Sequence, residues 1–275
     1  MKILITGESG IIISILKNNL QMYHISIPTH QELDLLNVNS IIKFLLKKEF
    51  DIVIHCAVQG DSKTKEEKID IIYNNLLMFE NILHFKNKFK MILNMDSAAI
   101  YDRTTDINNR KVLEYNSIPN DYFGFSKYLI YNKSLIYKNV YNIRIFNIFH
   151  PDEENENFIK SCFNAKKTGS KLIIHNDAYI DFVYYNDFIE LIKYYIDNIN
   201  NINNINNILE KTVNVCYNEK YKLSDIVKII ENIDIYKKID YDIISESDLN
   251  YTGYNNSKII YSGLINSLIN YNKKN

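Results

Sequence analysis

The sequence is poor in cysteine, with three in 275 residues. Cys56, Cys162 and Cys216 are far apart and odd in number, and no CxxC or Cys/His spacing that could build a zinc site occurs. We therefore expect no metal centre, and we expect a reducing, cytoplasmic compartment.

The sequence also has no excess of charge of one sign and no long apolar run. The formal net charge is -1 and the 32 basic residues are spread along the chain, so no feature favours nucleic acid or an anionic membrane as a partner. No apolar run reaches the ~20 residues of a membrane span. The first residues, MKILITG, enter a strand directly instead of forming a signal peptide. We therefore expect no nucleic acid and no membrane among the partners.

What the sequence does contain is an alternation of apolar strands and amphipathic helices. The expected strands are KILIT (2–6), YHISIP (23–28), FDIVIHCAV (50–58), FKMILNMDS (89–97) and YNIRIFNIF (141–149). The expected helices are IIISILKNNLQ (11–21), DLLNVNSIIKFLLKKE (34–49), IDIIYNNLLMFENILHF (69–85) and FSKYLIYNKSLIYK (125–138). Strands without polar alternation are buried on both faces, as in a parallel sheet. The order predicts an α/β fold with a doubly wound parallel sheet of Rossmann type, whose ligands bind at the carboxyl ends of the strands.

The pattern loosens after residue 150, which predicts a second, smaller part of the molecule. Residues 1–150 are expected to form a dinucleotide-binding domain. Residues 151–275 are expected to form mainly a substrate-binding lobe, with some segments returning to the main domain. Within this lobe, a helix is expected from about Phe158. The Asn/Ile repeat at 198–207 is interpreted as a polar connection or an irregular helix end, and the charged stretch at 62–68 as a solvated face.

The stretch TGESGIII joins the first strand to the first helix and contains two glycines. A turn that lays backbone N–H groups against a pyrophosphate, at the positive end of a helix, needs residues without Cβ where the chain approaches the phosphate. Gly7 and Gly10 meet this need, and Ile11 and Ile12 open the helix that follows. Ile13 stands where the third glycine of the usual pattern would fall, so we expect the helix to lie slightly further from the sheet.

Seven segments, in order, resemble one enzyme family over nearly the whole chain. They are KILITGESGIII, ELDLLN, NMDSAAIYD, FGFSK, IRIFNIFHP, YIDFVYYNDF and YTGYNNSKI. They are similar to the TGxxGxxG turn, the catalytic-serine strand, the YxxxK motif and the later substrate-binding segments of extended short-chain dehydrogenase/reductases. The resemblance is to the group of NAD(P)-dependent nucleotide-sugar epimerases, dehydratases and reductases, in particular to 4-keto reductases of the GDP-fucose synthase kind.

The resemblance implies a catalytic set in which one residue departs from the family pattern. By match, Ser97 is the serine that binds the sugar oxygen and Lys127 is the lysine that lowers the pKa of the family's tyrosine and holds the nicotinamide ribose. The tyrosine falls at position 123, where this chain has Phe123. Tyr122 lies about 140° round the helix from the lysine and is a poor substitute. We therefore expect a chain that binds cofactor and sugar and turns over very slowly, whether by natural loss or as a laboratory variant.

The same strand narrows the reaction that the resemblance implies. Dehydratases of the group carry an Asp-Glu pair where this chain has Ala98 and Ala99, so elimination of water lacks its acid and base. The bifunctional 3,5-epimerase/4-reductases use a cysteine and a histidine that align here with Ala99 and Asn157. What remains is hydride transfer by a 4-keto-6-deoxysugar reductase or, as an alternative, a 4-epimerase. A further alternative is a catalytically dead dinucleotide-binding sensor or scaffold.

The end of the second strand bears on cofactor choice. NAD binders keep an acid there for the ribose 2'-hydroxyl, whereas SIPTHQELDL has Thr29 and His30 and delays its acids. The sequence therefore favours NADP(H), with NAD(H) possible and His30 as a candidate phosphate ligand. The resemblance also implies that Asp34 and Leu35 contact the adenine and that Ala57 forms a wall beside the phosphates.

The partner implied by the resemblance is a nucleotide-diphosphate sugar. Its expected contacts are Ser97, Ala98, Asn147 and Phe158, while the late arginine that many relatives use on the diphosphate is replaced by Ile180. The family often dimerises through the helices that follow its third and fourth strands. The resemblance therefore implies a homodimer through a four-helix bundle.

Overall fold

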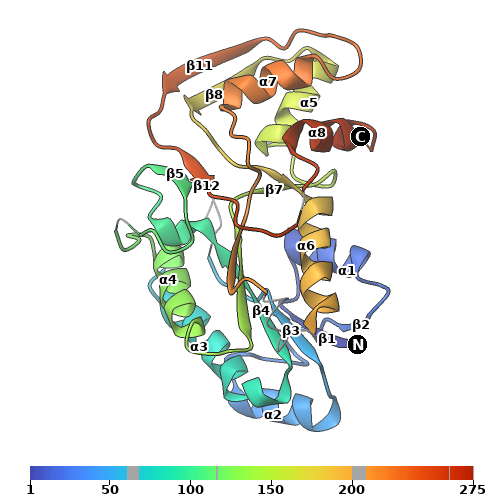
Figure 1. The fold of residues 1–275 in the computed structure, drawn as a ribbon, viewed down its shortest axis with the longest axis vertical. Helices are drawn as coiled ribbons and strands as arrows, with labels where there is room; N and C mark the ends of the chain where they lie inside the picture. The colour runs from blue at the N-terminus through green and yellow to red at the C-terminus, as the bar shows by residue number, and fades with distance from the viewer. Residues whose placement is uncertain (61–67, 116, 200–208, 260, 275) are drawn as a thin grey trace. The chain divides into compact units, whose positions relative to one another are not determined.

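The computed structural model describes residues 1–60, 68–115, 117–199, 209–259 and 261–274 (Figure 1). The chain divides into two compact units. The first unit comprises Met1–Asp102, Tyr115–Arg144 and Ile189–Val213. The second unit comprises Arg103–Glu114, Ile145–Phe188 and Asn214–Asn275. Each unit is assembled from three separate stretches of chain, so neither corresponds to one continuous segment.

The first unit is built on a six-stranded sheet with the strand order β10-β6-β4-β3-β1-β2. Its strands are β1 (Lys2–Thr6), β2 (His24–Ser26), β3 (Ile52–His55), β4 (Met91–Ser97), β6 (Val140–Ile145) and β10 (Thr212–Val215). Strand β1 pairs in parallel with β2 on one side and with β3 on the other, and β3 pairs in parallel with β4. The predicted α/β fold of Rossmann type is confirmed.

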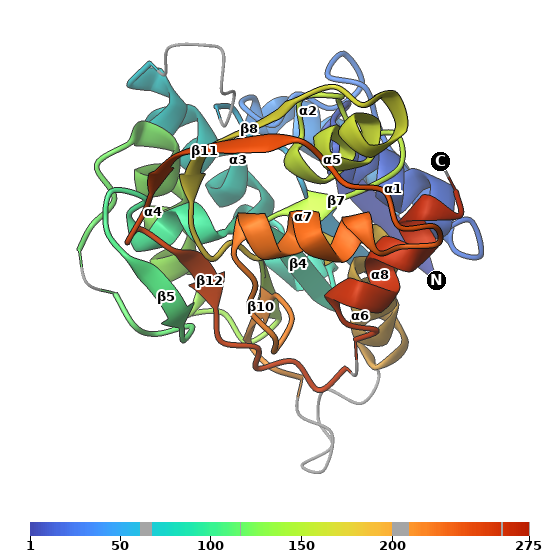
Figure 2. The same ribbon diagram turned by 90° about the horizontal axis from the view of Figure 1, so that it is seen from above.

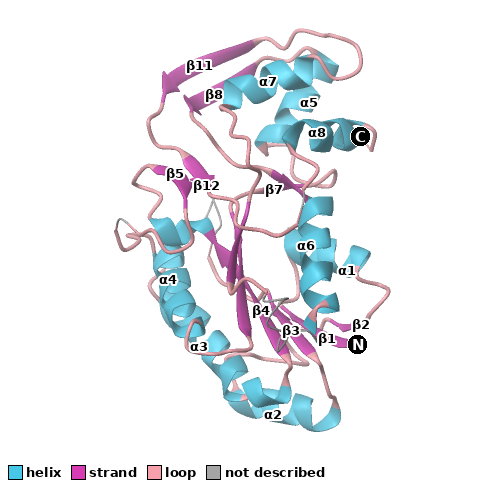
Figure 3. Cartoon of the chain, in the orientation of Figure 1, coloured by secondary structure: helices cyan, strands magenta, loops and turns pink. Residues whose placement is uncertain are grey.

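Helices cover both faces of this sheet (Figure 3). They are α1 (Ile11–Asn19), α2 (Val38–Lys47), α3 (Asp70–His84), α4 (Tyr122–Ser134) and α6 (Tyr185–Asp197), with the short 3-10 helices η1 (Lys86–Lys88) and η2 (Ala98–Tyr101). In α3 the buried residues Asn75, Met78, Phe79, Ile82 and Leu83 recur at helical spacing, which places one stripe of the helix in the core. Helix α3 packs against α4.

The strands at the centre of the sheet are buried on both faces. Ile3, Leu4 and Ile5 of β1 are at most 1% exposed, and every residue of β3 is buried. This burial explains why these segments read as continuous apolar runs without a polar alternation. β1 and β3 pair as far as Thr6 and His55, so the ends of the two strands lie side by side where the polar residues begin.

Among its described residues, the second unit contains three two-stranded sheets. They pair β5 (Ile107–Arg110) with β12 (Tyr251–Gly253), β7 (Ile148–Phe149) with β9 (Val183–Tyr184), and β8 (Leu172–Asp177) with β11 (Tyr241–Glu246). Its helices are α5 (Phe158–Thr168), α7 (Leu223–Glu231) and α8 (Leu264–Asn272). Helices α5 and α7 pack against each other and against β8, as Figure 2 shows from above.

Several element boundaries differ from the sequence-based expectation, among them the starts of α2 and α4 and the expected strand 141–149. Helix α2 begins at Val38 and not at Asp34, because the Asn37 side chain accepts the Asn39 N–H and caps the helix there. Helix α4 begins at Tyr122, where the Asp121 carboxylate accepts the Gly124 N–H at 2.7 Å. The expected strand 141–149 divides into β6 and β7, which belong to different sheets.

Two expectations fall largely outside the described residues. These are the Asn/Ile repeat at 198–207 and the charged stretch at 62–68. The predicted domain boundary at residue 150 stays a prediction. Among the helices that the structure describes, none is both long and apolar enough to cross a membrane.

Candidate active site

A cavity lies where β1 and β3 end, at the point where the chain order of the sheet reverses. The described residues that line it include five of the predicted cofactor-binding residues, namely Gly7, His30, Asp34, Leu35 and Ala57. Ligands of doubly wound sheets bind at this switch point, because the turns after the two central strands separate there. The cavity is therefore positioned to receive a dinucleotide.

The glycine turn after β1 adopts a backbone that other residues rarely reach. Gly7 has φ +102° and Gly10 has φ +117°. A Cβ on Gly7 would lie 2.8 Å from Ile13 Cδ1 and 3.2 Å from the Ala57 backbone nitrogen. The isoleucine at the third glycine position thus packs directly against the first glycine, which leaves no room for a side chain at position 7.

The N-terminus of α1 opens at this turn. Gly10 is its N-cap residue and no side chain caps the helix there. Ile11 is 41% exposed and Ile12 is half-buried, so the first turn of the helix is accessible. Uncapped N–H groups at the positive end of a helix bind phosphate groups. The glycine turn and the helix end that follows it therefore fit a pyrophosphate.

Replacing Gly7 with alanine is expected to weaken binding of NADPH by about tenfold to a hundredfold. The backbone at this positive φ is strained for alanine, and the new Cβ clashes with the Ile13 side chain. Isothermal titration of NADPH checks this. Gly169→Ala is the matched control, since Gly169 also has positive φ, +78°, but has nothing within 4 Å of the added Cβ. Equal loss of affinity in both variants would contradict the prediction.

Two buried side chains beneath the cavity were not singled out from the sequence. The Thr6 hydroxyl and His55 Nδ1 lie 2.9 Å apart across paired positions of β1 and β3. Burial, together with the nearby positive charge of Lys127, lowers the pKa of His55 to about 3. The imidazole is therefore neutral at physiological pH and joins the two strands as a hydrogen-bonding group.

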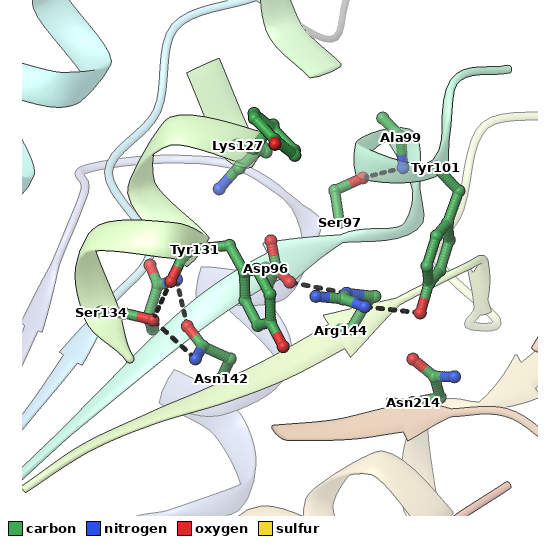
Figure 4. Close-up of polar contacts among 12 residues, drawn as sticks. Asp96, Ser97, Ala99, Tyr101, Lys127, Tyr131, Ser134, Asn142, Arg144 and Asn214 are labelled. Atoms are coloured by element: carbon green, nitrogen blue, oxygen red, sulfur yellow. Dashed lines mark hydrogen bonds and ion pairs between the residues drawn. The ribbon is translucent and has the colours of Figure 1, made fainter. Parts of the chain in front are cut away.

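Ser97 is the last residue of β4 and begins the turn that follows. Its Oγ accepts the Ala99 N–H at 3.2 Å and so caps η2 (Figure 4). This hydrogen bond uses the oxygen as an acceptor, which leaves the hydroxyl hydrogen to donate to another group. Ser97 is half-buried, whereas the next residue, Ala98, is fully buried.

Lys127 and Phe123 share one face of α4. Lys127 is 6% exposed, and its Nζ donates to the Met95 carbonyl oxygen at 2.7 Å, two residues before Ser97 on β4. The Phe123 ring is 3% exposed, and its centroid lies 5.7 Å from Lys127 Nζ. The aromatic ring at position 123 therefore lies beside the ammonium group, as its spacing predicts. Tyr122, the first residue of the helix, is 38% exposed.

Helix α4 approaches the serine turn closely at Gly124. A Cβ at this position would lie 2.7 Å from the Ala99 carbonyl oxygen and 2.9 Å from Pro119 Cβ. Only a residue without a side chain allows this distance between α4 and η2. The glycine thus holds the helix that carries Phe123 and Lys127 against the turn that begins at Ser97.

A buried ion pair links the strands next to this site. Arg144 Nε of β6 lies 2.7 Å from Asp96 Oδ2 of β4, and both side chains are fully buried. The guanidinium also lies 4.4 Å from the ring centroid of Tyr131 and donates to the Tyr101 hydroxyl (Figure 4). Burial lowers the pKa of Arg144, but the Asp96 carboxylate and the neighbouring tyrosines together more than offset this and raise it above its usual value. In the sequence, the only sign of this ion pair is that two charged residues, Asp96 and Arg144, each stand inside an apolar strand.

Asn75 of α3 forms hydrogen bonds with the loop after β3 and with α4. Its Oδ1 accepts the Gln59 N–H at 2.7 Å, and its Nδ2 donates to the Gln59 carbonyl oxygen and to Ser126 Oγ. The Ser126 hydroxyl in turn donates to the Phe123 carbonyl oxygen. Asn75 therefore joins the loop after β3 to α4, and through Ser126 it is linked to the backbone of Phe123.

The two remaining predicted substrate residues lie in the second unit. Asn147 is half-buried, and its Nδ2 donates to the Asp181 carbonyl oxygen at 2.9 Å. Phe158 begins α5 and stacks on Phe182, with ring centroids 5.9 Å apart. Ile180, which the resemblance places at the family's arginine position, forms a backbone bridge with Tyr251.

Glu153, in the loop before α5, is a buried carboxyl group. It is 8% exposed, and burial raises its pKa to about 7. The folded-state pKa lies above the unfolded one, because burial favours the protonated carboxyl. The folded state therefore keeps its full stability below about pH 4.5 and loses part of it as the pH rises through about 7. We expect the free energy of unfolding to fall by about 1–3 kcal/mol between about pH 5 and pH 8.

Glu153→Gln should remove this pH-dependent fall, as measured by urea unfolding at the two pH values. Glu154→Gln is the matched control, because Glu154 is the exposed neighbour in the same loop. The prediction fails if Glu153→Gln and Glu154→Gln leave the same dependence on pH.

The fold and the cavity at its switch point are those of the Rossmann-type dinucleotide-binding proteins. Residues 3–216 match the NAD dependent epimerase/dehydratase family, and the chain belongs to this family.

Several characterised proteins are similar to the chain over most of its length. GDP-L-colitose synthase of Yersinia pseudotuberculosis is 24% identical over 263 residues, which cover 86% of this chain and 83% of that protein. The structure of the GDP-mannoheptose C4 reductase from Campylobacter jejuni with NADP bound has a TM-score of 0.76 at 17% identity and covers 99% of this chain and 98% of its own. The dTDP-4-dehydrorhamnose reductase of Bacillus anthracis in complex with NADP has a TM-score of 0.78 at 15% identity, with 100% and 98% covered.

Proposed function

We propose that the protein is a nucleotide-sugar reductase of the 4-keto-6-deoxysugar type that uses NADP(H), and that Phe123 makes it slow. The observation that carries the proposal is the hydrogen bond from Lys127 Nζ to the Met95 carbonyl oxygen, two residues before Ser97. It joins the lysine of α4 to the strand that ends in the serine. The similarity to a colitose synthase and to reductases of heptose and rhamnose nucleotides supports the substrate class.

The cofactor part of the proposal rests on the cavity at the end of β1. Gly7 and Gly10 make room for a pyrophosphate, and the first turn of α1 offers it uncapped N–H groups. NADP is bound in the two reductase structures named above, and no acid stands at the end of β2, which supports NADP(H) over NAD(H). NAD(H) remains an acceptable second cofactor in this proposal.

The roles of the residues follow from their chemistry. The bound nicotinamide supplies the hydride that reduces the sugar carbonyl. The Ser97 hydroxyl donates a hydrogen bond to the carbonyl oxygen as negative charge develops on it. The Lys127 ammonium group, which lies one helical turn after Phe123 on α4, stabilises the same negative charge. Phe123 has no proton to give, so the oxygen would take its proton from water, a much weaker acid than a phenol, and the step would be slow.

The experiment is a comparison of 4-keto nucleotide sugars that differ in base and sugar. Each is incubated with the protein and NADPH, loss of NADPH absorbance is followed, and the reduced product is identified by mass spectrometry. Slow but stoichiometric reduction of a 4-keto-6-deoxy substrate is expected. The proposal fails if NADPH binds and no substrate is reduced even after long incubation.

That failure would favour a second candidate, a dinucleotide-binding sensor or scaffold. Phe123 is the observation that supports it, because the substitution removes the family's acid while the buried ring keeps its place beside Lys127. A sensor should bind NADPH in the absence of any sugar and change its association with another protein on binding.

We propose that the protein forms a homodimer through α3 and α4. The two helices pack against each other and leave apolar residues exposed, among them Tyr73 at 67% and Ile69 just before α3 at 65%. Two such helix pairs, one from each copy of the chain, would make a four-helix bundle. Light scattering after gel filtration measures the mass in solution, which should be that of a dimer.

A further inference from the structure

We infer that Glu8 and His30 act as opposing groups that set the ratio of NADPH to NADH binding. The inference rests on the proposed function, because it concerns the same dinucleotide cavity. In it NADP(H) remains the preferred cofactor, Glu8 lowers that preference, and the chain keeps NAD(H) usable.

The first step is the position of the Glu8 carboxylate. Glu8 lies in the glycine turn after β1, and its Oε2 accepts the His30 backbone N–H at 3.1 Å. His30 follows β2, the strand whose end carries the ribose-binding acid in NAD-dependent proteins. Glu8 therefore brings a carboxylate from the neighbouring loop to the place where β2 itself provides none.

The acids that follow β2 in the sequence are engaged elsewhere. The Glu32 carboxylate accepts both the Thr29 N–H at 2.9 Å and the Thr29 hydroxyl at 3.2 Å, which closes the turn. Asp34 Oδ1 accepts the Leu36 N–H at 2.9 Å. Glu8 lines the cavity, whereas Glu32 is not among its lining residues. Asp34 also lines the cavity but is expected to contact the adenine, so Glu8 is the lining acid that remains for the ribose of the adenosine.

The chemistry of the two cofactors then gives opposite effects at this carboxylate. The 2'-hydroxyl of NADH is a hydrogen-bond donor that a carboxylate accepts well. The 2'-phosphate of NADPH carries negative charge and has only acceptor oxygens facing the protein, so the same carboxylate repels it. A neutral amide of the same shape, as in Glu8→Gln, removes the repulsion and retains hydrogen bonding.

His30 is the group that favours NADPH and so opposes the effect of Glu8. It lines the same cavity and its side chain is 69% exposed, with Nδ1 3.8 Å from Asp34 Oδ1. An imidazole N–H donates to a phosphate oxygen, and a protonated ring also attracts it. His30 therefore supports the 2'-phosphate that Glu8 opposes, and removing either side chain should move the ratio in opposite directions.

The test measures binding, so it does not depend on turnover. Dissociation constants for NADPH and NADH are determined by isothermal titration for the unmodified chain and for Glu8→Gln, His30→Ala and Glu32→Gln. Glu8→Gln should raise the preference for NADPH over NADH by about tenfold, and His30→Ala should lower it by about threefold. Glu32→Gln, a matched change at the turn-forming acid, should leave the ratio unchanged.

Salt gives a second readout of the same effect. The gain from Glu8→Gln should shrink at about 1 M salt, where the Debye length falls to about 3 Å. The inference is overturned if Glu8→Gln leaves the ratio unchanged or moves it only as far as Glu32→Gln does. A chain that binds neither dinucleotide would instead refute the proposed function, and the inference with it, so the two failures are distinguishable.

Discussion

Phe123→Tyr is expected to raise the rate of sugar reduction by about 10²- to 10⁴-fold, which is the range for a positioned general acid. The ring is 3% exposed and its centroid lies 5.7 Å from Lys127 Nζ, so the added hydroxyl stands beside the ammonium group that lowers the phenol pKa. Single-turnover reduction of a 4-keto nucleotide sugar by bound NADPH measures the change. Affinity for NADPH should stay the same, because the glycine turn and α1 are untouched.

Phe125→Tyr is the matched control for this prediction. It makes the same chemical change two residues along α4, at a half-buried position that does not share the face of Lys127. Its rate should equal that of the unmodified chain. A second control combines Phe123→Tyr with Lys127→Met, which should lose most of the gain. If Phe123→Tyr and Phe125→Tyr reduce the sugar equally slowly, the proposed role of position 123 is wrong.

Asp96→Ala is expected to lower the free energy of unfolding by about 3–5 kcal/mol, because it leaves Arg144 charged and buried without its carboxylate. The tyrosine rings around the guanidinium offer attraction to the cation but no countercharge. Urea unfolding followed by circular dichroism measures the loss. Since Asp96 precedes Ser97, a slower reduction in the Phe123→Tyr background should accompany it.

The comparison that isolates burial uses an exposed ion pair in the same chain. Lys171 Nζ and Asp242 Oδ2 lie 2.7 Å apart, with side chains 50% and 60% exposed. Asp242→Ala should cost far less stability than Asp96→Ala, because both members of this pair are in water. Replacing both buried partners, with Asp96→Leu and Arg144→Met, should recover part of the stability that Asp96→Ala loses. Equal losses at the buried and the exposed pair would contradict the account of the Asp96–Arg144 pair given above.

The parts of the fold that could be predicted from the sequence are those with local signals. β1, β3 and β4 are short apolar runs because both faces of the central sheet are covered, so each run indicates a parallel strand by itself. β5 and β12 gave no such signal. Their pairing joins residues more than a hundred positions apart, and it is supported by single contacts such as the Asn109 N–H on Thr252 Oγ1 at 2.7 Å.

The candidate site divides in the same way. The glycine turn and the Phe123–Lys127 spacing lie within one loop and one helix, so the sequence could indicate them. The contact between Glu8 and His30 depends on β1 and β2 being neighbours in the sheet, and the pair of Asp96 and Arg144 depends on the pairing of β4 with β6. Partners on different strands leave no pattern in the sequence, because their spacing is set by the connections between strands.

The strand order also governs how the first unit is completed during synthesis. β6 has β4 on one side and β10 on the other, and β10 begins at Thr212, long after β6 ends. Until that later stretch leaves the ribosome, the outer side of β6 carries N–H and C=O groups without strand partners, and such an edge invites pairing between chains. A nascent or truncated chain that stops after β6 is therefore an aggregation hazard, and the edge is closed only by residues made after the Ile145–Phe188 stretch of the second unit.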